Sequence, residues 1–367
     1  RFETGMALQV LFEHPTVECL AAELAGSASV IETPIEILPR DGELPLSYAQ
    51  QRLWFLDQLD PDSPMYNIPW AIKLNGALDK AALQTAVNTV VARHEVLRSS
   101  FNTINGNAAL TIADALTLPI DWETVAAGQL QARVTELTEQ SIDLGKAPLM
   151  RVHVLQETAE SCVLLVVIHH IIADGISMNN LFTELSATYR GEQATLPQLP
   201  VQYVDYAAWQ QQHLASVGEQ QLIYWRESLA NAPALLELPT DRPRPAVQTF
   251  AGRLAGRLMN PATAQGVRNL AKRSGSTLFM TMLAGFDALL ARYSGQTDIV
   301  VGTPVTARSR SELEPLLGMF LNTLPLRADL SANPSFDELL QQVRRNTLGA
   351  YANQDIPFEQ LVEKLQP

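Results

Sequence analysis

The chain has 367 residues, of which 47% are hydrophobic and 18% are charged, a composition that excludes wholesale disorder. Its net charge of −13 argues against nucleic acid as a partner, and its two cysteines exclude a disulfide framework. The longest apolar run, Cys162–Ile168, is too short to span a bilayer, and the N-terminus lacks a signal-peptide pattern. We therefore expect a cytoplasmic protein with no membrane segment.

Residues 1–25 predict the end of a helical unit. Thr16 is a candidate N-cap, and the apolar residues that follow it recur at helical spacing. Because one short amphipathic helix cannot bury its own face, its packing partners are expected upstream of Arg1. Residues 26–45 contain three prolines and predict a linker.

Residues 46–215 predict an α/β lobe, in which helices alternate with β-branched strands. One helix carries an apolar stripe from Leu83 to Leu97, and the strand Cys162–Ile168 is expected to be buried on both faces. The other predicted elements are a helix capped by Ser47, strands at Tyr66–Leu74 and Met150–Leu155, and a helix at Ser177–Tyr189.

Residues 216–367 predict a second α/β lobe after a proline-rich boundary that one helix interrupts. Its pattern resembles that of the first lobe, which suggests an internal duplication. The lobe is expected to stop early, so that it exposes unpaired strand edges. Its predicted elements are strands Phe250–Met259, Ile299–Val305 and Leu321–Arg327 and helices Ala262–Ser274, Thr277–Tyr293, Phe336–Tyr351 and Phe358–Leu365.

The candidate chemistry lies in one segment, His169 to Gly175, directly after the buried strand. Adjacent strand residues point to opposite faces, so His169 and His170 cannot both bind one metal ion, and no metal site is expected. One histidine is expected to face a cavity and the other to pack inward. Asp174 and Gly175 predict a turn in which glycine permits an unusual φ. The alternative is that both histidines are ordinary core residues.

The segment resembles the HHxxxDG signature of condensation domains of nonribosomal peptide synthetases. Five further blocks match the family's other motifs in the same order, with Asn353 standing where the family often has histidine. They are Ser47–Leu56, Arg93–Arg98 with Phe101, Tyr203–Trp209, Gly318–Thr323 and Asn353–Phe358. The segment that ends at Leu24 resembles the last helix of a peptidyl carrier domain.

The resemblance implies a chloramphenicol-acetyltransferase-like fold, in which two α/β lobes form a V with a tunnel between them. Upstream and downstream carrier domains, loaded by adenylation domains, would deliver their substrates on phosphopantetheine arms, and no cofactor would be bound directly. The upstream acyl or peptidyl thioester would be attacked by the downstream aminoacyl amine, which forms a peptide bond. The short linker, with no epimerization domain in between, favours an L-configured donor.

Site roles follow from the same resemblance. His170 would face the tunnel and act either as general base or by positioning the amine, with His169 and Gly175 completing the signature. Asp174 would pair with Arg308 across the lobe interface. Arg52, Arg98 and Asn322 would support the tunnel or the motifs.

Several alternatives share part of this pattern. A non-catalytic condensation-like recruitment module would typically lack the active histidine, whereas a free-standing CoA-dependent acyltransferase would lack the carrier remnant. An epimerization domain needs a further carboxylate, and a heterocyclization domain carries aspartates in place of the histidine pair.

Overall fold

A computed structural model describes residues 10, 16–26, 33–126, 128–246, 252 and 254–366. These residues fall into two compact units, which we treat separately. Unit A comprises residues 34–213 together with 306–321, and unit B comprises the described parts of 1–33, 214–305 and 322–366. Helix α7 (Tyr203–Ser228) begins in unit A and ends in unit B.

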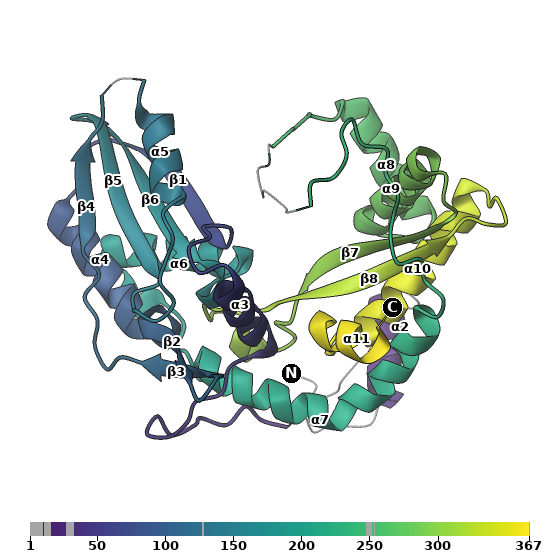
Figure 1. Cartoon of the computed structure of the whole chain (residues 1–367), viewed down its shortest axis with the longest axis horizontal. Helices are drawn as coiled ribbons and strands as arrows, with labels where there is room; N and C mark the ends of the chain where they lie inside the picture. Colours follow the sequence, from purple (N-terminus) through teal and green to yellow (C-terminus); the bar gives the residue numbers. More distant parts are fainter. Residues whose placement is uncertain are drawn as a thin grey trace. The chain divides into compact units, whose positions relative to one another are not determined.

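Unit A is built on a four-stranded sheet with the strand order β1-β6-β5-β4 (Figure 1). The strands are β1 (Asn67–Asn75), β4 (Ile120–Thr124), β5 (Met150–Thr158) and β6 (Ser161–His169). The β1/β6 and β5/β6 pairs are antiparallel, whereas β4 and β5 run parallel. Strand β6 lies inside the sheet, and all of its residues after Ser161 are buried. This confirms the burial predicted from its run of Val, Leu and Ile.

Around this sheet, α4 (Lys80–Arg93) packs on α6 (Gly175–Tyr189), and α5 (Leu130–Thr138) contacts β1 and β6 (Figure 1). The remaining elements are α3 (Tyr48–Leu59), the β2–β3 hairpin (Ser99–Ile104, Asn107–Ile112) and the 3-10 turns η1 (Glu95–Arg98), η2 (His170–Ile172), η3 (Gln193–Thr195) and η4 (Ser311–Leu313). The predicted capping by Ser47 is confirmed, and Gln50 completes a capping box.

Helix α4 is shorter than its apolar stripe predicted. It ends at Arg93, because His94 takes an extended conformation with φ −107° and ψ 111°. The chain then turns through η1, which still buries Leu97, so the stripe marks one core face shared by two elements.

Unit B contains α2 (Val17–Gly26), α8 (Pro261–Arg273), α9 (Leu278–Ser294), α10 (Phe336–Ala352), α11 (Phe358–Leu365) and the paired strands β7 (Asp298–Thr306) and β8 (Leu321–Asp329). Helix α9 packs on both α8 and α10. In the described part of the chain, no single helix is long and apolar enough to cross a membrane, although α8 and α9 meet the criteria as a pair bent by 108°.

The predicted strand Phe250–Met259 is not found. Residues 250, 251 and 253 lie outside the described residues, and residues 252 and 254–259 form no strand. The side chains of Leu254 and Leu258 are almost fully exposed. An apolar extended segment forms a strand only where a neighbour completes its hydrogen bonds, and these described residues pair with none.

Asp287 is a buried carboxyl on α9 whose removal is expected to stabilise the protein. Burial raises its pKa to about 7, and its Oδ1 atom has no hydrogen-bond partner among the described residues. Because the folded-state pKa is raised, stability is lost as the pH rises from about 4 through 7. Asp287→Asn should therefore raise the free energy of unfolding by about 2–3 kcal/mol more at pH 8 than at pH 5. Urea unfolding at both pH values tests this, with the exposed Asp62→Asn as control, and an equal effect at both would contradict it.

Candidate functional site

The histidine signature lies where the central strand of unit A ends. His169 is the last residue of β6, His170 opens the 3-10 turn η2, and Asp174 is the N-cap of α6. The strand, the turn and the helix cap follow one another within six residues. The segment is therefore held at one end by the sheet and at the other by the helix.

The two histidines occupy different environments, and His169 is the one that packs inward. His169 is buried, and its Nδ1 accepts a hydrogen bond of 3.2 Å from the Ile171 N–H. His170 is half-buried, and its backbone N–H donates to the Tyr66 carbonyl at 2.8 Å. The His170 Nδ1 atom is buried and has no hydrogen-bond partner in the described part of the chain. His169 is thus a fixed core residue, whereas no hydrogen bond from the described residues holds the His170 ring at Nδ1.

Because of His169, we expect the protein to lose stability in acid. Burial, reinforced by the neighbouring charge of His170, lowers its pKa to about 4. The unfolded chain takes up this proton nearer pH 6.5, so stability is complete above that value and is lost as the pH falls towards 4.

Between pH 7 and pH 5 this single group should cost about 2 kcal/mol. His169→Gln keeps an acceptor for the Ile171 N–H but cannot titrate, so its stability should change less over this range. His153, whose pKa burial also lowers, leaves a residual slope. Urea unfolding at both pH values measures the difference, and identical slopes in variant and wild type would refute the assignment.

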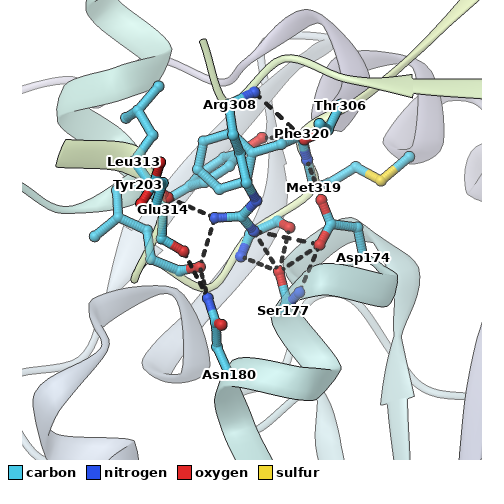
Figure 2. A network of polar contacts seen from close by, with 12 residues as sticks. Asp174, Ser177, Asn180, Tyr203, Thr306, Arg308, Leu313, Glu314, Met319 and Phe320 are labelled. Atoms are coloured by element: carbon cyan, nitrogen blue, oxygen red, sulfur yellow. Dashed lines mark hydrogen bonds and ion pairs between the residues drawn. The ribbon is translucent and has the colours of Figure 1, made fainter. Parts of the chain in front are cut away.

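The Asp174 carboxylate is occupied by structural contacts (Figure 2). It is fully buried, and Oδ1 accepts hydrogen bonds of 2.7 Å from both the N–H and the hydroxyl of Ser177. Oδ2 accepts a hydrogen bond of 3.1 Å from the Phe320 N–H. None of these donors is an imidazole, so Asp174 does not orient His170 through a hydrogen bond; it caps α6 and holds the segment around Phe320.

The predicted pair of Asp174 and Arg308 is present, with Nη2 3.3 Å from Oδ1. Arg308 also donates to the carbonyls of Leu313 and Leu316 at 2.6 and 2.8 Å and lies over the Phe320 ring. Burial lowers its pKa, and Asp174 opposes that shift. Arg308 lies in the segment 306–321, which belongs to unit A together with Asp174, so the pair forms within one compact unit. That it joins the two predicted lobes stays a prediction.

Three residues that sequence reasoning left without a role complete this network. The buried Ser177 hydroxyl lies 2.8 Å from both the Gly318 carbonyl and Arg308 Nη2, and it accepts from the Gly318 N–H at 3.0 Å. Gly318 has φ +155°, and a Cβ there would lie 1.9 Å from the Tyr203 ring, so only glycine fits. The Asp-x-x-Ser spacing was the available signal for Ser177, because an N-cap side chain faces the residue three positions later.

The expected role of Gly175 is wrong. Its φ is not positive, and it is the exposed first residue of α6. Asp174 accomplishes the change of direction with an extended backbone, after which Gly175 simply begins the helix.

The contacts of two of the three support residues, Arg98 and Asn322, are with backbone groups away from the histidines. Arg52 is exposed on α3, and Arg98 donates to the carbonyls of Ala113 and Asp114, which ties η1 to the end of the hairpin. In unit B, the Asn322 amide donates to the carbonyls of Gln354 and Ile356, each at 2.8 Å. Its oxygen accepts from two backbone N–H groups. The side chain of Asn322 is therefore fully used in holding β8 to the residues before α11.

Chemically, unit A presents the His170 imidazole at the end of β6, and the buried ionic network of Asp174 begins four residues further along the chain. Among the described residues, no group of three or more histidine, cysteine or acidic side chains is arranged to hold a metal ion. An imidazole in this setting can accept a proton or a hydrogen bond from a nucleophile.

Comparison with known proteins agrees with this arrangement. The Condensation domain family model matches residues 40–367. One of the subunits of linear gramicidin synthase from Brevibacillus parabrevis is 45% identical over 99% of this chain, and the match spans 8% of that much longer protein.

Solved structures show the same fold. The X-domain from teicoplanin biosynthesis, solved in complex with OxyB, has a TM-score of 0.82 and 31% identity over 92% of this chain and 77% of its own. A holo four-domain nonribosomal peptide synthetase bound to AMP and glycine has a TM-score of 0.80 and 28% identity over 92% of this chain and 26% of its own. The expected α/β fold is confirmed, and the chain belongs to the condensation domain family.

Proposed function

We propose that the chain forms a peptide bond between an acyl or peptidyl thioester on an upstream carrier domain and an aminoacyl thioester on a downstream carrier domain. The observation that carries the proposal is the contrast between the residues of the signature. Asp174 and His169 are occupied by structural contacts, whereas His170 is only half-buried and its buried Nδ1 has no hydrogen-bond partner among the described residues. Within the signature, His170 is therefore the residue we assign to the substrate amine.

Peptide bond formation requires one group that handles the proton of the attacking amine. An α-amine has an ordinary pKa near 8, so near neutral pH it must lose a proton before or during attack. The imidazole of His170 would accept that proton or hold the amine by a hydrogen bond. The amine then attacks the thioester carbonyl, and the carrier thiol leaves. A thioester is already activated, so placement of the two phosphopantetheine arms would supply a large share of the acceleration.

We assign the partners as carrier domains on both sides, with adenylation domains adjacent to them, in the cytoplasm. Residues 1–25 would be the end of the upstream carrier domain. In support, Thr16 caps α2 as predicted, and the synthase match extends over nearly the whole chain although the Condensation model begins at residue 40. We also propose an L-configured donor, because a short linker joins the carrier segment to the condensation domain.

The direct test is a single-turnover reaction between two carrier domains, one loaded with an acyl donor and the other with an aminoacyl acceptor. Intact-mass measurement of the acceptor carrier should show the gain of the donor acyl group only when the chain is present. Folded protein that binds both carriers without this transfer would overturn the proposal.

The likeness to the teicoplanin X-domain favours a second candidate, a module that recruits another protein. The same reaction separates the two, because a recruitment module would produce no acylated acceptor at any carrier concentration. The retained His170, which is only half-buried at the end of β6, favours catalysis.

A further inference from the structure

Part of the predicted linker is packed on unit A. Residues 34–43, here called the linker strap, precede the β-bridge between Leu44 and Leu110. Ile35 is buried, and the Leu38 N–H donates to Asp205 Oδ1 at 2.9 Å. The strap therefore has fixed partners at Ile35 and Leu38, although its composition alone indicated a linker without contacts.

Arg40 makes the strongest of these contacts. Its guanidinium binds Asp205 through two hydrogen bonds of 2.8 and 3.0 Å, and its Nε donates to Glu95 Oε2 at 2.9 Å. The Asp205 side chain is fully buried, while that of Arg40 is 27% exposed. A bidentate contact to a buried carboxylate is both strong and directional.

The receiving site is held together without the strap. Glu95 follows α4, and Asp205 lies in the first turn of α7. Gln202 connects them, because its N–H donates to Asp205 Oδ2 at 2.8 Å and its Oε1 accepts from the Glu95 N–H at 3.0 Å. We call Glu95, Gln202 and Asp205 the acidic socket. Both acids belong to blocks that the sequence singled out and that the condensation chemistry does not use.

We propose that the acidic socket docks the linker strap and thereby limits the reach of the domain that precedes it, which on the proposed function is the donor carrier. Only residues 27–33 separate α2 from the docked strap. Seven residues span at most about 25 Å, whereas release of the strap up to residue 43 gives seventeen residues and about 60 Å. Docking thus keeps the donor at a higher local concentration.

The first test measures docking without needing activity. Arg40→Gln should make the Leu38 amide exchange with solvent at least about tenfold faster. It should also open the strap to a glutamate-specific protease after Glu36 and Glu43. Glu95→Gln, which removes one contact, should have a smaller effect. Arg190→Gln is the matched control, because it breaks an exposed pair with Glu192 on the same unit. Unchanged exchange at Leu38 in Arg40→Gln would overturn the docking.

The second test measures delivery in the intact synthetase. With the donor on its own upstream carrier, Arg40→Gln should slow transfer about fourfold, because local concentration falls with roughly the −3/2 power of tether length. With the donor supplied on a separate carrier domain, the rate should equal that of wild type. An unchanged rate in the first arrangement, or an equal loss in both, would overturn the role in delivery. If wild type forms no product, the proposed function fails, and the exchange measurement still decides the docking.

Discussion

Replacing His170 with alanine is expected to slow peptide bond formation by about 10²–10⁴-fold. The reason is that the variant removes the group proposed to receive the proton of the attacking amine. The fold should persist, because His170 Nδ1 has no hydrogen-bond partner among the described residues and the backbone bond to Tyr66 does not depend on the side chain. Single-turnover transfer between loaded carriers, read by intact mass, measures the effect.

A second substitution separates the two roles open to this imidazole. His170→Asn keeps a polar group but no basic nitrogen, so it should remain as slow as alanine if His170 accepts the proton. Substantial recovery with asparagine would assign a positioning role instead. Asn179→Ala, on the exposed face of α6, is the control and should react at the wild-type rate. A wild-type rate in His170→Ala would refute the proposal.

Replacing Asp174 with alanine is expected to lower the free energy of unfolding by about 3–5 kcal/mol. The substitution leaves the guanidinium of Arg308 buried without its counter-charge, and it removes the acceptor for the N–H groups of Ser177 and Phe320. A buried donor that loses its partner incurs its full cost of desolvation. Urea unfolding by circular dichroism gives the value directly.

A double-mutant cycle tests the pairing itself. Asp174→Asn with Arg308→Met should cost less than the sum of the single variants, because neither leaves the other as an unpaired charge. The exposed pair of Lys146 and Asp143, with side chains 83% and 59% exposed, is the reference, and Lys146→Ala should leave the free energy of unfolding nearly unchanged, because solvent screens the pair. Strict additivity at Asp174 and Arg308 would show that the contact carries no coupling energy.

Most elements were predictable because their signals are local. The cap at Ser47, the run of branched residues in β6 and the apolar spacing of α9 and α10 each specify an element within a few residues. The β2–β3 hairpin was missed although its signal is equally local, since Asn105 and Gly106 take φ values of 52° and 82° at the turn. The strand at Phe250–Met259 failed for the opposite reason, because a strand also needs a neighbour that no local pattern supplies.

The candidate site also has a part that local sequence indicates and a part that only distant contacts decide. Its histidines and its aspartate were recognisable from their pattern at the end of a strand, whereas the family and the partner of Asp174 were readable only through the resemblance to condensation domains. The sequence could not indicate that Ser177 meets Gly318, 141 positions later, or that Gly318 leaves room for the Tyr203 ring. These contacts depend on how the segment 306–321 folds back onto unit A.

By itself, then, the amino-acid sequence determined most of the helices and strands, the place of the signature at the end of a strand and the resemblance to the condensation domain family. Periodicity, caps and motifs depend on residues close together in the chain, so they can be recognised without a structure. The tertiary structure alone decided that Asp174 is used by the fold, that His170 Nδ1 has no hydrogen-bond partner in the described part of the chain and that Arg40 binds Asp205. Each of these depends on which buried donors and acceptors meet, and that is settled only when distant segments pack together.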